Sequence, residues 1–68
     1  MKQELFLEKL RLWLRRDFPS TQAAADHFGL PHKAYIADMI GGRRKVANAI
    51  LDHYGYSRVR LTEYVRHG

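Results

Sequence analysis

Hydrophobic residues in the first part of the chain recur at the spacing of an α-helix. Residues 3–16 contain no glycine or proline and consist mostly of strong helix formers, so we expect one helix there. At 100° per residue, one arc collects the apolar side chains that we expect to face the core, namely Phe6, Leu7, Leu10, Trp13 and Leu14. The opposite side carries Glu4, Glu8, Arg11 and Arg15.

Turn-forming residues predict a second, short helix after the first. Pro19 ends the first helix, and Ser20 or Thr21 can cap the next one by accepting a hydrogen bond from an unpaired backbone amide. The segment TQAAADHF, residues 21–28, then gives about two turns of helix. Its inward residues should be Ala24, Ala25 and Phe28.

Glycine and proline also bound the next two helices. Gly29 suits a left-handed C-terminal cap, and Pro31 suits the first turn of a helix over residues 32–40. Inward positions of that helix should be Ile36, Met39 and Ile40, and Gly41 with Gly42 should stop it. KVANAILDHY, residues 45–54, reads as a fourth helix with Val46, Ile50, Leu51 and Tyr54 apolar.

In the C-terminal tail, residues 56–68, the spacing of hydrophobic residues changes from a helical period to a two-residue period. Val59, Leu61 and Val65 alternate with polar residues, which favours a strand, although a short fifth helix would also align part of this set. Everything before the tail reads as helix, so a strand at residues 57–66 would lack a partner within the chain. The first helix also carries a second apolar stripe, Leu5 and Leu12, which would be exposed to solvent unless another segment or subunit packs on it. We therefore expect the tail and this stripe to form a homodimer interface, with residues 57–68 as the dimerisation tail.

Length and charge narrow the class of protein. A chain of 68 residues with 46% hydrophobic content predicts one small folded domain over residues 1–68. There is no cysteine and no apolar run near the roughly 20 residues of a membrane span, so we expect a cytoplasmic protein without a membrane partner. The net charge is +5, and residues 43–68 hold six basic and two acidic side chains. Such a one-sided positive charge indicates a polyanionic partner: DNA, RNA or an anionic membrane.

Two short helices joined through a glycine turn have the form of a helix-turn-helix, whose second helix fits the major groove of DNA. The start of the second helix, at Thr21 and Gln22, offers free backbone amides to a phosphate. Exposed residues of the third helix should be His32, Lys33, Tyr35, Ala37 and Asp38. Arg43, Arg44 and Lys45 should clamp the phosphates on the far side.

The stretches STQAAADHFGLPHKAYIADMIGGRRKV and ILDHYGY resemble the lambda-repressor-like, Cro/XRE-type helix-turn-helix regulators of phages and bacteria. The resemblance spans roughly residues 3–57 and implies a compact four-helix domain, usually homodimeric on a palindromic operator. It also implies DNA contacts from Gln22, His32 and Lys33. The interval from Gly29 to Ile36 is one residue longer than is usual in that family, so either the turn is longer or Tyr35 takes the inward position. The tail is nearer to Cro-like proteins with C-terminal strands.

Together these features predict a dimeric, sequence-specific repressor of phage or mobile-element origin that binds a double-stranded DNA operator. The alternative is a protein-interaction module of the same fold, for instance a phage inhibitor of a host complex, which would expose an apolar patch on the third helix. Non-specific DNA or RNA binding is a third hypothesis. We expect no cofactor, small-molecule ligand or metal, because the four histidines lack ligand spacing. We expect no enzyme activity, because no nucleophile–base pair is evident.

Overall fold

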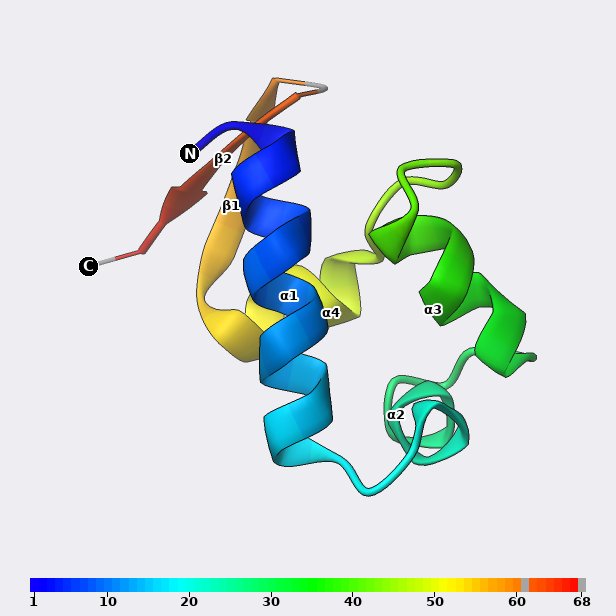
Figure 1. Ribbon diagram of the computed structural model, residues 1–68. Helices are drawn as coiled ribbons and strands as arrows, with labels where there is room; N and C mark the ends of the chain where they lie inside the picture. The colour runs from blue at the N-terminus through cyan, green and yellow to red at the C-terminus, as the bar shows by residue number, and fades with distance from the viewer. Residues whose placement is uncertain (61, 68) are drawn as a thin grey trace.

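The computed structural model describes residues 1–60 and 62–67, and its fold is mainly helical (Figure 1). In chain order the elements are α1 (Gln3–Asp17), α2 (Thr21–His27), α3 (Lys33–Ile40), α4 (Asn48–Tyr54), β1 (Tyr56–Arg60) and β2 (Glu63–Arg66). The strands form a two-stranded antiparallel sheet beside α1, while α2 and α3 lie on the other side of that helix. The expected mainly α class, with four helices before a β tail, is confirmed at this level.

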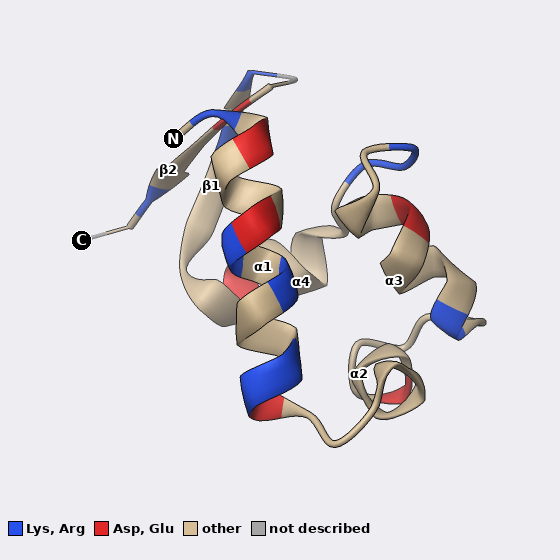
Figure 2. Ribbon diagram, viewed as in Figure 1, with Lys and Arg blue, Asp and Glu red and all other residues tan. Residues whose placement is uncertain are grey.

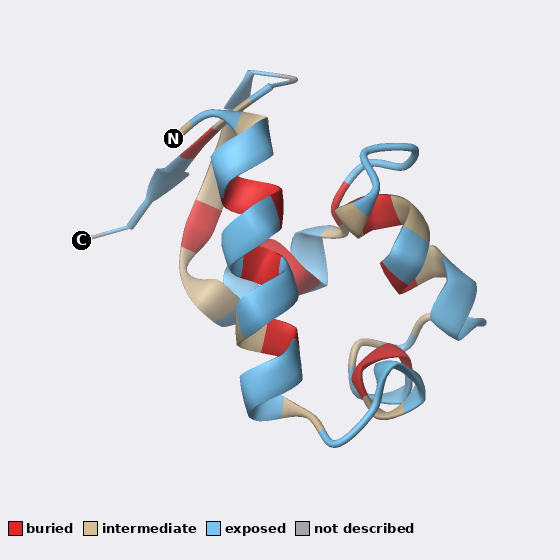
Figure 3. Ribbon diagram, viewed as in Figure 1, coloured by how far each residue is buried: buried red, intermediate tan, exposed pale blue. Residues whose placement is uncertain are grey.

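The core is built around one face of α1 (Figure 3). Phe6, Leu7, Leu10 and Leu14 are buried as the helical arc predicts. They meet Ala24 and Ala25 of α2, Ile36 and Met39 of α3, Ile50 and Leu51 of α4, and Val46 from the loop before α4. Trp13 was expected in the core but is only partly buried, because it lies at the edge of the arc and stacks on Tyr54 at 5.1 Å.

Capping residues set the ends of the short helices. The Ser20 hydroxyl accepts a hydrogen bond from the Ala23 amide at 3.1 Å, which makes Ser20 rather than Thr21 the cap of α2. Gly29 after α2 and Gly55 after α4 have φ of +70° and +73°, the left-handed conformation that favours glycine. The third helix starts at Lys33, one residue later than expected. His32, which the sequence placed in this helix, is its N-cap residue.

The fourth helix is shorter than predicted. It begins at Asn48, three residues after the expected start at residue 45. Val46 is buried in the preceding loop, and Arg58 of β1 donates a hydrogen bond to its carbonyl oxygen at 2.7 Å. Val46 thus enters the core from a segment that is not helical, and Arg58 binds its carbonyl oxygen, so the helix does not extend to residues before Asn48.

The tail corrects the expectation of a single unpaired strand. It folds back on itself as a hairpin in which Tyr56 pairs with Arg66, Ser57 with Val65 and Arg58 with Tyr64. The prediction was wrong because the alternating pattern covers two strands rather than one. Leu61 lies outside the described residues.

Two tyrosines of the hairpin complete the core. Tyr56 and Tyr64 are buried, and their rings lie 5.2 Å and 4.2 Å from the ring of Phe6. The other face of the hairpin exposes Val59 and Val65. The hairpin is therefore part of the domain itself, and its inner face cannot also serve a second subunit.

The first residues of the chain hold the hairpin against α1. Lys2 forms an antiparallel bridge with Glu63, and the Tyr64 amide donates to the Met1 carbonyl at 2.7 Å. The amide of Gln3 donates to the Thr62 carbonyl, also at 2.7 Å. The beginning of the second strand thus lies between β1 and the start of the chain and has backbone partners on both sides.

A hydrogen-bonded carboxylate joins the end of α1 to α4 and gives a pH-dependent prediction. Asp17 accepts hydrogen bonds from Arg16 at 2.8 Å and from the Tyr54 hydroxyl at 2.8 Å. Because these bonds favour the ionised form, with Arg16 the larger cause, the pKa of Asp17 falls from 3.8 to about 2. A lowered pKa contributes stability that is present above pH 4 and is lost as pH falls towards 2.

We expect the melting temperature of Asp17→Asn to lie below that of the wild-type protein at pH 5, and the difference to shrink as pH falls from 4 to 2. Thermal unfolding followed by circular dichroism across this range measures it. Asp52→Asn is the matched control, because Asp52 is an exposed carboxylate on α4. A difference between Asp17→Asn and wild type that stays constant with pH would contradict the assignment.

Candidate functional site

A groove of about 640 Å³ lies between the start of α2 and the outer face of α3. Its lining residues are Ser20, Thr21, Gln22, Lys33, Ala34 and Ala37. These side chains are small or polar, and the lining contains one cation and no carboxylate. The groove therefore combines polar groups from the start of α2 and the Lys33 amine with the apolar surface of two alanines.

The sequence of α2 explains how the two helices come close enough to share this groove. Ala24 and Ala25 are fully buried, and their methyl groups let the neighbouring helices approach closely. The turn at Gly29 then redirects the chain, and the Leu30 amide donates to the Ala25 carbonyl at 2.8 Å. The relative position of α2 and α3 is thus fixed by buried contacts and by a backbone hydrogen bond.

The register of α3 decides which of its side chains face outward. Ile36 is 2% exposed whereas Tyr35 is only half-buried, so Ile36 rather than Tyr35 takes the inward position. Lys33, Ala34 and Ala37 are exposed. Ala34 was not among the predicted site residues, although helical periodicity places it between Ala37 and Asp38 on the outer face.

One flank of α3 carries a stacked group. The Arg44 guanidinium lies 3.9 Å above the ring of Tyr35, and the ring of His32 lies 6.1 Å from that of Tyr35. Stacking on an aromatic face holds a guanidinium in one orientation and leaves its N–H groups free to donate. The expected exposure of Tyr35 is therefore corrected to half-buried, because Arg44 covers it.

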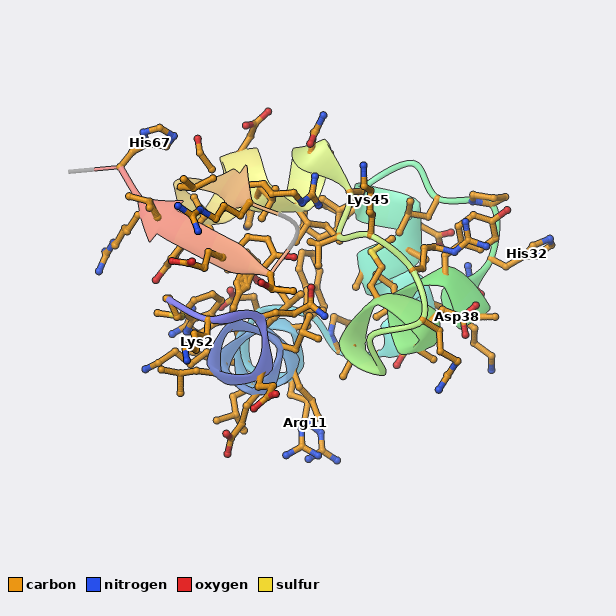
Figure 4. The ribbon with its side chains drawn as sticks, turned by 90° about the horizontal axis from the view of Figure 1, so that it is seen from above. Lys2, Arg11, His32, Asp38, Lys45 and His67 are labelled. Carbon is orange, nitrogen blue, oxygen red and sulfur yellow. The ribbon has the colours of Figure 1, made fainter. Side chains whose placement is uncertain are left out.

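The three basic side chains that follow α3 have different neighbours. Arg43 forms an ion pair with Asp38 at 3.1 Å, which partly covers Asp38 and offsets its charge on this face. Arg44 lies on Tyr35. Lys45 points to the side of the molecule opposite Arg11 (Figure 4). The three side chains, which the sequence predicts to clamp phosphates together, therefore have different surroundings in the structure.

The structure thus divides the predicted contact residues into two groups. Thr21, Gln22, Lys33 and Ala37 meet in the groove, while His32, Tyr35 and Arg44 form the stacked flank. Gln22 is oriented along α2 by a hydrogen bond from its amide nitrogen to Asp26 at 2.9 Å.

The predicted interface residues form a separate set. Leu5, Leu12, Val59 and Val65 are 48–59% exposed. Leu5 and Leu12 belong to α1, and Val59 and Val65 belong to the hairpin, which Figure 1 shows across α1 from α3. Among the described residues these are the exposed large hydrophobic side chains, and none of them lies on α3.

The part of the chain that the structure describes contains neither a cluster of metal ligands nor a membrane-spanning helix. Residues 1–60 and 62–67 contain no group of three histidine, cysteine or carboxylate side chains placed to hold a metal ion. None of the described helices is long and apolar enough to cross a bilayer. The groove beside α3 remains the site that the geometry favours. Comparison with known proteins gives no family model, no curated protein and no solved structure that matches this chain.

Proposed function

We propose that this protein is a sequence-specific DNA-binding repressor that inserts α3 into the major groove. In this proposal α2 and α3 form a helix-turn-helix within a lambda-repressor-like domain, and a homodimer binds an inverted-repeat operator. Bound across a promoter, the dimer would exclude RNA polymerase sterically. A phage or mobile element is the proposed source.

The observation that carries the proposal is the groove at the start of α2. The major groove is about 12 Å wide and admits one helix, and the side chains that reach base edges must be short or flexible. Lys33 supplies a flexible donor for guanine, and Ala34 with Ala37 allows close approach to bases. Ser20, Thr21 and Gln22 supply polar groups beside them for the phosphate backbone.

Charge supports DNA over a protein partner at this surface. Figure 2 shows basic residues in the first turn of α3 and in the loop after it. The one acidic residue of α3, Asp38, is paired with Arg43. An interaction module would expose a large apolar patch on α3, whereas the exposed large hydrophobic residues lie on α1 and the hairpin.

The exposed apolar residues support a dimer, with a changed role for the tail. The hairpin already pairs within one chain, so a shared strand is not needed to satisfy it. Its outer face, with Val59 and Val65, and the α1 stripe, with Leu5 and Leu12, remain uncovered. In the proposal a second copy covers them, while α3 stays free for DNA.

Selection of bound sequences from random duplex DNA tests the proposed function. We expect an inverted repeat whose half-site centres are about 10 base pairs apart, because the two recognition helices of a two-fold dimer sit about 34 Å apart on one face of the duplex. An unrepeated motif would contradict the dimer. No enrichment of any motif would contradict sequence-specific binding.

The dimer surface gives a separate prediction. We expect Leu12→Lys to convert a dimer into a monomer at micromolar concentration, because it places a charge in an apolar interface without disturbing the core. Operator affinity should fall by about 10²–10⁴-fold, because a monomer loses the avidity that a dimer gains from binding two half-sites. Sedimentation velocity measures the first effect and titration of labelled operator the second. Ala49→Lys, at an exposed position of α4, is the control, and equal dimerisation of both variants would place the interface elsewhere.

A further inference from the structure

We propose that Arg11 and Arg15 of α1 bind DNA phosphates and extend the contact surface beyond α2 and α3. The inference rests on the proposed function, since it assigns two further residues to the same DNA face. The sequence had indicated only that both residues lie opposite the core side of α1.

The first support is the position of the two arginines beside the groove. A second groove, of about 350 Å³, has Arg11 and Arg15 on one wall and Ser20 and Thr21 on another. Ser20 and Thr21 also line the groove beside α3. The two grooves therefore meet the same residues at the start of α2, and in this proposal a DNA backbone strand that crosses that point passes next to the arginines.

The second support is that neither arginine is neutralised. Within residues 1–60 and 62–67, the ion pairs join Arg16 to Asp17 and Arg43 to Asp38. Arg11 and Arg15 are exposed and take part in neither pair. Figure 4 shows Arg11 extending away from the body of the molecule, with its guanidinium in open space. An exposed guanidinium group outside any ion pair can donate its N–H groups to phosphate oxygens.

The distribution of charge along α1 limits which part of this helix can lie against the DNA backbone. Its exposed stripe carries Glu4 and Glu8 in the first half and the two arginines in the second half (Figure 2). Carboxylates repel phosphates, so the DNA backbone should cross only the end of α1 that leads into α2.

The salt dependence of binding tests this assignment in the full-length chain. Each phosphate contact contributes about 0.9 to the slope of log K against log salt concentration. We expect Arg11→Gln and Arg15→Gln each to reduce the slope by about 0.9, and the double variant by about 1.8, with an unchanged sequence preference. The double Arg→Lys variant should keep the wild-type slope, because lysine retains the charge. Lys9→Gln is the matched control, as Lys9 is an exposed cation about 120–160° around α1 from the two arginines.

An unchanged slope in the double Arg→Gln variant would overturn the inference, as would an equal reduction in Lys9→Gln. Both results would leave the proposed function intact, provided that the wild-type protein binds its selected duplex. Failure of the wild-type chain to bind any duplex would instead overturn the proposed function and this inference with it. Thermal unfolding of each variant confirms that the fold is kept.

Discussion

Replacement of Tyr64 by alanine is expected to unfold most of the protein at room temperature. The Tyr64 side chain is 1% exposed and stacks on Phe6 at 4.2 Å, so its removal opens a cavity beside the centre of the core. Loss of a large buried aromatic side chain costs about 3–5 kcal/mol. A single core in a chain of this size supplies about that much net stability.

Urea unfolding followed by far-ultraviolet circular dichroism measures this effect. Tyr64→Phe keeps the stacked ring and should cost less than about 1 kcal/mol. Val65→Ala is the matched control on the same strand, because Val65 is 50% exposed and its truncation leaves no cavity. Similar costs for Tyr64→Ala and Val65→Ala would contradict the assignment of the hairpin to the core.

The same contacts decide what truncation of the tail would do. A chain that ends at Gly55 lacks both Tyr56 and Tyr64, so Phe6 loses two of its aromatic neighbours. Such a fragment should unfold rather than form a stable monomer. Substitutions on the outer face of the hairpin are therefore the correct way to examine dimerisation.

Replacement of Ala37 by glutamate is expected to abolish specific DNA binding, with at least a 100-fold loss of affinity. Ala37 is exposed and lines the groove beside α3 with Lys33 and Ala34, so a glutamate there adds a carboxylate to the surface proposed to meet DNA. Juxtaposed like charges cost several kcal/mol at an interface. Stability should change little, because alanine and glutamate are both good helix formers.

Fluorescence anisotropy with a duplex obtained by selection measures the loss. Ala49→Glu introduces the same change at an exposed position of α4, which contributes no residue to the groove. It controls for the added negative charge. Comparable losses in Ala37→Glu and Ala49→Glu would show a general charge effect and would remove α3 from the binding surface.

Local rules were sufficient for most of the helical part of the chain, with the start of α4 as the exception. The arc of Phe6, Leu10 and Leu14 is buried as its 3.6-residue period indicates. The glycines at positions 29 and 55 adopt positive φ where a helix had to end. Periodicity and helix-capping chemistry depend on neighbours within a few residues, so they can be read directly from sequence.

Long-range contacts decided the remaining features. The pairing of β1 with β2 depends on where the tail reverses, and a two-residue alternation is the same for one strand or for two. The partial burial of Tyr35 depends on the Arg44 guanidinium that covers its ring, and the start of α4 depends on the burial of Val46. Each of these is a choice between competing contacts made by segments distant in the chain.

By itself the sequence determined that there are four helices, the apolar face of α1 and the glycines that end α2 and α4, because those properties arise from local backbone and side-chain preferences. Only the tertiary structure decided that the tail is a hairpin completing the core and that Thr21, Gln22 and Lys33 share one groove with Ala34. It also placed Arg11 and Arg15 in a second groove, which shares Ser20 and Thr21 with the first. The physical reason is that the groove lies between two helices. Its walls form only when the buried faces of α2 and α3 pack into the core.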